Sequence, residues 1–110
     1  MANTPERKVK DKVTALLRGF GAYYFFPPAN GFGRSGIPDI IACYRGQFLA
    51  IECKAGKNTA TRLQLREIDY INKAGGIALV VNEHNITEIE QILSQLEKHH
   101  DREDSAGTTT

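Results

Sequence analysis

Three charged residues in the middle of the chain have the types and spacing that metal-dependent hydrolysis uses, namely Asp39, Glu52 and Lys54. Asp39 lies in the stretch IPDIIACY (residues 37–44), and the other two lie in QFLAIECK (residues 47–54). Both stretches are rich in apolar and β-branched residues, which predicts strands. The two residues between them, Arg-Gly, predict a tight turn and an antiparallel hairpin, which would bring Asp39 close to Glu52.

The second of these strands has a charged face and an apolar face. Side chains alternate along a strand, so Glu52 and Lys54 project from the same face. Leu49, Ile51 and Cys53 share the other face, and we expect them to join the core.

Two carboxylates that converge on a covered sheet face repel each other and are poorly hydrated. A hard divalent cation removes the repulsion, and carboxylates, a backbone carbonyl and waters are the ligands that Mg²⁺ prefers. Lys54 would then stand beside the cation. There an ammonium group can orient or help to deprotonate a water, or stabilise charge that develops on a phosphate.

Each of these residues also has a purely structural explanation. Glu52 and Lys54 would form a solvent-facing pair on a half-exposed strand, and Asp39 would be a turn residue after Pro38. A Glu-x-Lys pattern alone is common in proteins. It is the ordered set of all these residues that favours a site over surface charges.

Two further polar side chains lie on the predicted flanking helices. Glu6 falls near the edge of the apolar arc of the first helix, so it either points toward the core or interacts with the helix dipole as an N-terminal acid. Gln64 precedes Ile68 by four residues and Ile71 by seven, on the apolar face of the second helix. It is either a buried polar contact or a group that reaches a water or a phosphate at the site.

Start and stop signals place the other elements. Thr4, Pro5 and Glu6 supply an N-cap hydroxyl, a first-turn proline and an acid for a helix start, and Gly75-Gly76 ends the second helix. The elements expected outside the hairpin are a helix from Thr4 to Gly19 or Gly21, a strand over Ala22–Phe26, a loop over Pro27–Gly36, a helix from near Thr61 to Ala74, a strand over Ile77–Val81 and a helix from about Ile86 to Lys98.

The resulting element order is α-β-β-β-α-β-α. A helix between the third and fourth strands is a crossover, and the short apolar run Ile77–Val81 is typical of a strand that is covered on both faces and paired in parallel. We therefore expect an α/β fold with a mixed four-stranded sheet flanked by helices. The length of 110 residues predicts one domain, over residues 1–100, followed by a disordered tail at 101–110.

The composition is that of a globular protein, with 41% hydrophobic and 25% charged residues. No apolar run approaches the ~20 residues that a membrane span needs, and the N-terminal residues lack the apolar stretch of a signal peptide. Cys43 and Cys53 lie in apolar runs and predict two buried thiols in a reducing compartment. We therefore expect a cytoplasmic protein without membrane contact.

The charge is unevenly distributed along the chain, although its net value is +1. Residues 1–66 contain eleven Lys or Arg and four Asp or Glu, whereas residues 67–110 contain three and nine. Such a division can make one face basic, as a nucleic-acid partner requires, or it can reflect a solvated basic helix and an acidic tail.

The ordered set of these motifs resembles the PD-(D/E)XK nuclease superfamily, and most of all its virus-type replication-repair nuclease (VRR-NUC) family. The motifs are, in chain order, GIPDII, IECKAGK, Gln64 and the KAGG that precedes IALVV. That family is marked by a Gly-x-Pro-Asp strand, a Glu-x-Lys strand and a Gln on the following helix. Arg34 and Gly36 also match its usual sequence. The resemblance covers about residues 6–81 and implies a restriction-endonuclease-like fold.

The resemblance also implies roles for individual residues. Asp39 and Glu52 would bind Mg²⁺ or Mn²⁺ together with the backbone carbonyl of Cys53, and Lys54 would activate the attacking water. Glu6 would complete the metal site, and Gln64 would support it. Seven basic side chains are candidates for contacts with DNA phosphates, although each could equally be an ordinary surface charge. They are Lys8, Lys10, Lys12, Arg34, Lys57, Arg62 and Arg66.

Small members of this family resemble homodimeric endonucleases that cut branched DNA such as four-way (Holliday) junctions, in phage genome processing, recombination or repair. The resemblance thus implies a Mg²⁺-dependent endodeoxyribonuclease that is encoded by a phage and acts inside its bacterial host. The apolar AYYFF segment and the loop over residues 27–36 are candidates for the dimer contact or for DNA strand separation. The alternatives are a non-catalytic nucleic-acid-binding or assembly module, and an interaction domain that binds a protein through its acidic last helix.

Overall fold

The computed structural model describes residues 3–28 and 33–107, and their side chains as far as residue 101. Residues 29–32 of the expected loop therefore lie outside the described residues. The elements of the described chain are α1 (Pro5–Phe20), β1 (Tyr23–Phe25), β2 (Ile40–Tyr44), β3 (Gln47–Cys53), α2 (Arg62–Lys73), β4 (Ile77–Val81) and α3 (Thr87–Gly107). This order confirms the predicted α/β fold.

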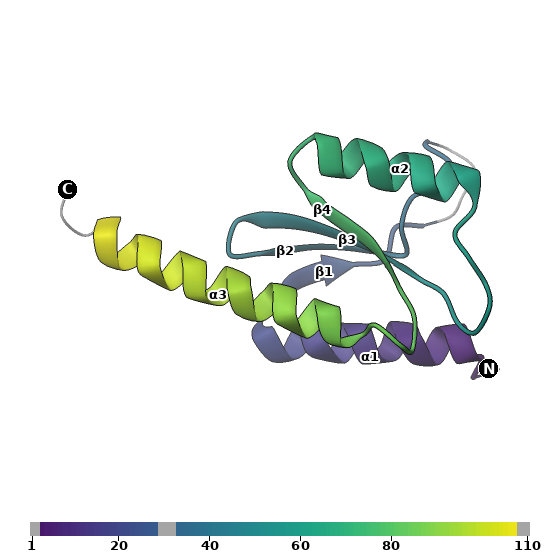
Figure 1. Cartoon of the computed structure of the whole chain (residues 1–110), viewed down its shortest axis with the longest axis horizontal. Coiled ribbons are helices and arrows are strands. Elements are labelled where there is room, and N and C mark those ends of the chain that lie inside the picture. The colour runs from purple at the N-terminus through teal and green to yellow at the C-terminus, as the bar shows by residue number, and fades with distance from the viewer. Residues whose placement is uncertain (1–2, 29–32, 108–110) are drawn as a thin grey trace.

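The four strands form one mixed sheet in the order β1-β2-β3-β4 (Figure 1). The pairs β1–β2 and β2–β3 are antiparallel, and β3–β4 is parallel, as a crossover through α2 requires. The hairpin register places Ile40 opposite Ile51. Arg45 (φ 50°) and Gly46 (φ 81°) both adopt left-handed backbone conformations, which is the two-residue hairpin turn that the sequence predicted.

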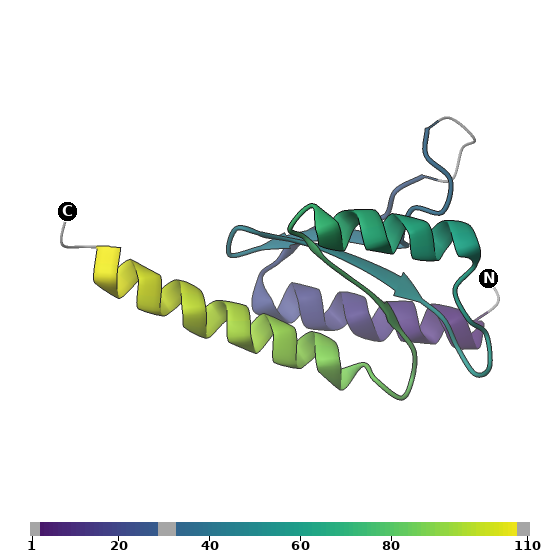
Figure 2. The ribbon, with the colours of Figure 1, turned by 45° about the horizontal axis from the view of Figure 1, so that its top comes forward.

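The helices lie on both faces of the sheet. α1 and α3 run side by side on one face, and α2 lies on the other, over β3 and β4 (Figures 1 and 2). The core lies between the sheet and the α1–α3 layer. Its largest fully buried aliphatic side chains come from α1, the hairpin, β4 and α3: Leu17, Ile40, Ile51, Leu93, Val13 and Val81.

Capping interactions fix the start of the two helices that border the site. The Thr4 side chain accepts a hydrogen bond from the Arg7 amide (3.1 Å), with Pro5 in the first turn, so α1 begins where its sequence predicts. α1 ends at Gly21, whose φ of 86° permits the left-handed cap. Thr61 caps α2 in the same way as Thr4 caps α1.

Strand β2 begins at Ile40, three residues later than predicted. Continuing the hairpin register would place Pro38 opposite Cys53, and proline has no N–H to donate to a ladder. The chain therefore leaves the sheet before Ile40. The Asp39 carboxylate, rather than a backbone carbonyl, accepts the hydrogen bond of the Cys53 amide.

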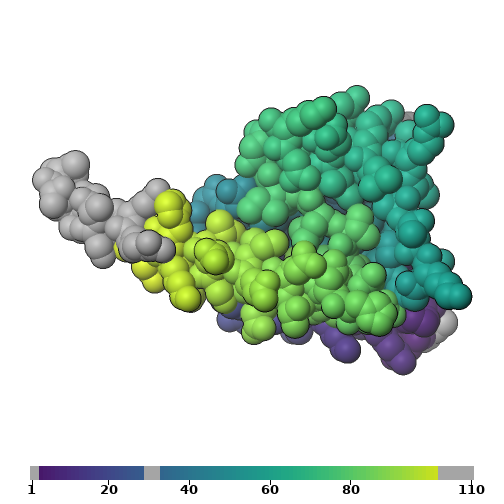
Figure 3. Space-filling model, in the orientation of Figure 1, coloured from purple at the N-terminus to yellow at the C-terminus, as the bar shows by residue number. Residues whose placement is uncertain are grey.

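The last helix is longer than predicted. The apolar stripe of α3 suggested an end near Lys98, but the helix continues to Gly107, so residues 101–107 are helical rather than disordered. The sequence from His99 to Ala106 contains neither Pro nor Gly, and therefore nothing that would stop a helix. The C-terminal part of α3 extends past the hairpin as an arm of the molecule (Figures 1 and 3). The domain boundary at residue 100 stays a prediction.

The two cysteines differ in burial. Cys53 is fully buried, as predicted, but Cys43 is exposed, so the prediction of two buried thiols is wrong for Cys43. Cys43 is exposed because it lies on the sheet face that α2 covers only in part. It is opposite Phe48, which is 45% exposed, on the half of this face that α2 does not reach. Within the described residues, none of the helices is long and apolar enough to cross a membrane.

Candidate active site

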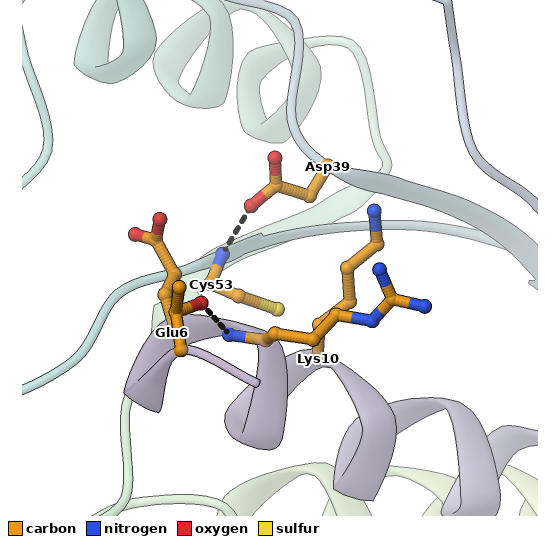
Figure 4. Close-up of a pocket in the computed structure, with 6 residues that line it drawn as sticks. Glu6, Lys10, Asp39 and Cys53 are labelled. Carbon is orange, nitrogen blue, oxygen red and sulfur yellow. Dashed lines mark hydrogen bonds between the residues drawn. The ribbon is translucent and has the colours of Figure 1, made fainter. Parts of the chain in front are cut away.

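The predicted charged residues come together where the β2–β3 hairpin ends next to the start of α1, since Asp39, Lys54 and Glu6 all act on the charge of Glu52. Asp39 and Cys53 line a cavity of about 240 Å³ there, together with residues from the first turns of α1. Figure 4 shows the Asp39 carboxylate directed at the Cys53 amide, with Glu6 and Lys10 reaching the same cavity from α1. The lining residues are Thr4, Glu6, Arg7, Lys10, Asp39 and Cys53. Glu52 and Lys54 do not line the cavity at this point.

Glu52 and Lys54 are not a solvent-facing pair. Glu52 is 2% exposed, and the Lys54 side chain is 14% exposed. The Lys54 Nζ lies 3.4 Å from the Glu52 Oε2, so the two groups form an ion pair on the face that the sequence assigned to them. Taking both charges out of water costs free energy, which their mutual attraction offsets only when further hydrogen bonds satisfy the remaining polar atoms.

The Glu52 carboxylate is only half satisfied. Among the described residues, its Oε1 atom is buried without a hydrogen-bond partner. Burial and the nearby Asp39 raise the pKa of Glu52 to about 7, whereas Lys54 acts in the opposite direction. A buried anionic oxygen without a partner is destabilising unless another group binds it.

Asp39 is held against the backbone of β3. Its Oδ2 accepts a hydrogen bond from the Cys53 amide at 2.9 Å. The next amide, that of Lys54, donates in the opposite direction, to the Val81 carbonyl of β4 (2.9 Å). Because the N–H and C=O of one strand residue point to the same side, the Cys53 carbonyl faces the Asp39 side of β3.

The Cys53 side chain has no part in this site. It is buried in the core on the opposite face, and burial raises the pKa of its thiol to about 12, with Asp39 and Glu52 adding to the effect. The thiol is therefore neutral at physiological pH, and a divalent cation would meet the carbonyl of Cys53 rather than its sulfur.

The donor set fits a hard divalent cation. Asp39 and Glu52 supply carboxylates, Cys53 supplies a carbonyl, and the unpartnered Glu52 Oε1 provides an open ligand position. Mg²⁺ is commonly bound by one or two carboxylates and completed by water. The described residues contain no group of three or more His, Cys, Asp or Glu side chains that could hold a metal ion.

Glu6 lies at the edge of the site rather than on the core side of its helix. It is exposed, and it lines the cavity beside Asp39. Burial and Asp39 raise the pKa of Glu52 most, and the negative charge of Glu6 adds a smaller effect in the same direction. A role for Glu6 as a direct ligand stays a prediction.

Gln64 has a structural role that sequence reasoning missed, although Thr61-x-x-Gln64 has the spacing of a capping box. Its Oε1 accepts a hydrogen bond from the Thr61 amide (2.8 Å), and its own amide donates to the Thr61 hydroxyl (3.2 Å). The two residues form the capping box of α2. The side-chain carbonyl of Gln64 is therefore engaged in the cap, and its predicted support of the site stays a prediction.

Arg34 has a protein partner that sequence reasoning missed. Its guanidinium binds Glu67 of α2 through two hydrogen bonds, Nε to Oε1 at 2.7 Å and Nη2 to Oε2 at 2.9 Å. Glu67 is 4% exposed, and the hydrogen bond from Arg34 lowers its pKa. Glu67 follows Gln64 by three residues and thus shares its helix face, which is a signal that the sequence contained.

The other basic candidates differ in their position. Lys10 is half-buried, lines the cavity, and has its Nζ 4.3 Å from the centre of the Phe26 ring. Arg7 also lines the cavity and pairs with Asp11 at 3.2 Å. The candidates that lie exposed on α1, on the β3–α2 loop and at the start of α2 are Lys8, Lys12, Lys57, Arg62 and Arg66.

Comparison with protein families gives a match that covers most of the chain. The model of the family described as "Archaeal holliday junction resolvase (hjc)" matches residues 6–104. A search of curated proteins finds no match.

Solved structures with a similar fold include two VRR-NUC domain proteins. One, described as "VRR_NUC domain", has a TM-score of 0.62 at 24% identity over 83% of this chain and 96% of its own. The other, "VRR_NUC domain protein", has a TM-score of 0.57 at 24% identity over 86% of each chain. Hjc of Archaeoglobus fulgidus, a Holliday junction resolvase, has a TM-score of 0.51 at 22% identity over 70% of this chain and 65% of its own. At these identities the similarity shows a common fold.

Proposed function

The chain belongs to the archaeal Holliday junction resolvase (Hjc) family, and from this premise we propose that it is a divalent-metal-dependent endonuclease that hydrolyses phosphodiester bonds in branched DNA, four-way junctions included. The observation that carries the proposal is the buried carboxylate of Glu52, whose Oε1 is without a partner among the described residues. Asp39 and Lys54 stand beside it at the end of the hairpin. A fold retained only for binding would not need a half-satisfied, buried anion.

The cation would be held by the Asp39 and Glu52 carboxylates and the Cys53 carbonyl. When bound, Mg²⁺ or Mn²⁺ supplies a Lewis acid that polarises a phosphate oxygen and lowers the pKa of an attacking water. Asp39 is oriented for this by the Cys53 amide, which fixes one of its two oxygens. Neutralising the two carboxylates would also remove the repulsion that raises the pKa of Glu52.

Lys54 supplies positive charge at the reacting phosphate. Its Nζ is held within 3.4 Å of Glu52, and a side chain that is 14% exposed has little freedom to move away. We assign to its ammonium group the orientation of the attacking water and the stabilisation of charge on the phosphate as the new P–O bond forms and the old one breaks. Lys10 and Arg7, which line the cavity from α1, are placed to bind flanking phosphates.

A second copy of the chain is the partner that cleavage of a symmetric junction requires, because two strands must be cut. The half of the sheet beyond α2 exposes large apolar side chains, with Tyr23 71% and Phe48 45% exposed. Beside them a groove of about 680 Å³ separates α2 from the hairpin and is lined by Phe48, Tyr70 and Ile71 among others. We propose that this face forms a two-fold interface, in which the aromatic side chains of one protomer enter the groove of its partner.

Sedimentation of the wild-type protein and of two charge variants tests this interface. Phe48→Glu is expected to make the protein monomeric. Leu65→Glu serves as the matched control, because Leu65 is 52% exposed on α2 and does not line the groove. A monomeric wild type, or a Phe48→Glu variant that remains dimeric, would contradict the proposed interface.

Cleavage assays test the activity itself. We expect the protein to cut a labelled four-way junction faster than a flap or a linear duplex, only with Mg²⁺ or Mn²⁺ present. Glu52→Gln and Lys54→Ala should each abolish cleavage, whereas Lys73→Ala, which removes a surface ion pair with Asp69 on α2, should not. Binding without cleavage in every metal would favour the non-catalytic module instead. Cleavage that survives Glu52→Gln would assign the reaction to another site.

A further inference from the structure

The position of Asp39 depends on the segment that precedes it. Strand β2 pairs with β3 only from Ile40 onward, so the sheet does not hold Asp39 through backbone hydrogen bonds. Residues 33–38 lead into it, and Pro38 at their end is fully buried. Whatever fixes this segment therefore also sets where the Asp39 carboxylate lies relative to Glu52.

Gly36 brings the segment into direct contact with α2. Its φ is +80°, and a Cβ built on it would lie 2.5 Å from the backbone carbon and oxygen of Leu63 and 2.8 Å from the Gln64 amide nitrogen. Such distances are not tolerated between real atoms, so only glycine permits this approach. The backbone of the segment thus packs on the first turn of α2.

Arg34 forms the second link between the segment and α2. Its two hydrogen bonds to Glu67 have the parallel, bidentate geometry that fixes both groups in orientation as well as in distance. Glu67 has a side chain only 6% exposed, whereas that of Arg34 is 61% exposed. The buried carboxylate is therefore the fixed member of the pair, and Arg34 is tied to it.

We infer that the ion pair of Arg34 and Glu67, which we call the clasp, positions Asp39 for cation binding by fixing residues 34–38 against α2. The inference rests on the proposed function, since it assumes that Asp39 is a metal ligand. Neither member of the clasp touches the reacting atoms, so both are positioning residues. Partners that orient metal ligands typically change metal affinity by about 10- to 100-fold when they are removed.

A DNA phosphate contact is the competing role for Arg34, and it makes a different prediction for Glu67. If Arg34 bound phosphate, Arg34→Gln would weaken DNA binding and leave cation binding unchanged. Glu67→Gln would then leave DNA binding unchanged or strengthen it, because it releases the guanidinium. If the clasp positions Asp39, the two substitutions should have the same effect on cation binding, with DNA absent.

The experiment is a double-mutant cycle read by Mn²⁺ binding without DNA, with free Mn²⁺ measured by electron paramagnetic resonance. Arg34→Gln and Glu67→Gln are each expected to weaken Mn²⁺ binding about 10-fold, and the double variant no further, because the pair acts as a unit. Asp69→Asn is the control on the same helix, since it removes a surface ion pair with Lys73 and should leave Mn²⁺ binding unchanged.

Thermal unfolding of each variant separates positioning from folding. If a variant unfolds at a lower temperature but binds Mn²⁺ as tightly as the wild type, the clasp only stabilises the fold and the inference is wrong. Additive effects of the two substitutions would also contradict it. A wild-type protein that binds no Mn²⁺ overturns the proposed function and the clasp together, whereas wild-type binding that both variants retain overturns the clasp alone.

Discussion

Replacing Glu52 by glutamine should stabilise the metal-free protein while it abolishes cleavage. In the folded protein, burial and the neighbouring Asp39 raise the pKa of Glu52 from 4.5 to about 7. At a pH between 4.5 and about 7, Glu52 is therefore protonated in more of the folded molecules than of the unfolded ones. Stability therefore falls as the pH rises from 4.5 to about 7 and is level above that. Glutamine is similar in shape and cannot ionise, so it removes this dependence.

The magnitude follows from the two pKa values. Ionisation of Glu52 destabilises the folded wild type by about 1 kcal/mol at pH 5 and by about 3 kcal/mol at pH 8, and Glu52→Gln should regain these amounts. The difference between the two pH values, about 2 kcal/mol, is the quantity to measure because it cancels the effects of packing. The pair with Lys54 is already included, since Lys54 lowers the same pKa.

Urea unfolding in EDTA at pH 5 and pH 8 measures this difference. Glu90→Gln, at an exposed position on α3, is the matched control and should show no comparable change with pH. Adding Mg²⁺ at pH 8 should stabilise the wild type and leave Glu52→Gln nearly unchanged, because the cation binds the ionised carboxylate. A Glu52→Gln variant no more stable than the wild type at pH 8, or a gain equal at both pH values, would refute the reasoning.

Three further predictions concern packing. Gly36→Ala should lower the free energy of unfolding by at least about 2 kcal/mol in urea titrations, because it adds a left-handed residue and a clash with the α2 backbone; a smaller loss would show that the segment moves away freely. Asn72→Ala should lower the free energy of unfolding by about 1–3 kcal/mol in the same titration. The side-chain amide of Asn72 accepts a hydrogen bond from the Ala78 N–H (2.8 Å) and donates one to the Ala78 C=O (3.0 Å), and both backbone groups lose this partner in the variant. An unchanged unfolding midpoint would contradict this. In the Phe48→Glu monomer, a thiol reagent should modify the exposed Cys43 at once and Cys53 only on unfolding. Cys53 is buried, and burial raises the pKa of its thiol to about 12. Rapid modification of both cysteines would show that the core opens.

Local signals predicted most of the fold. The start and end of α1 and the Arg45-Gly46 turn depend on a few neighbouring residues, so the sequence displays them directly, and the order of the elements indicated the crossover before β4. The predictions that failed concern the ends of elements and the burial of single side chains. Strand β2 starts late because a continued register would put Pro38, which has no N–H, opposite Cys53, and Cys43 is exposed because α2 covers only half of its sheet face.

For the site, the sequence by itself determined which groups are present and that Glu52 and Lys54 share a strand face, because alternation along a strand is a local property. Only the tertiary structure decided that this face is covered there, which makes Glu52 a buried anion with a raised pKa instead of a surface charge. It also decided that Arg34 binds Glu67, 33 residues further along the chain. Burial and long-range pairing depend on how helices dock on the sheet, and no short stretch of sequence contains that information.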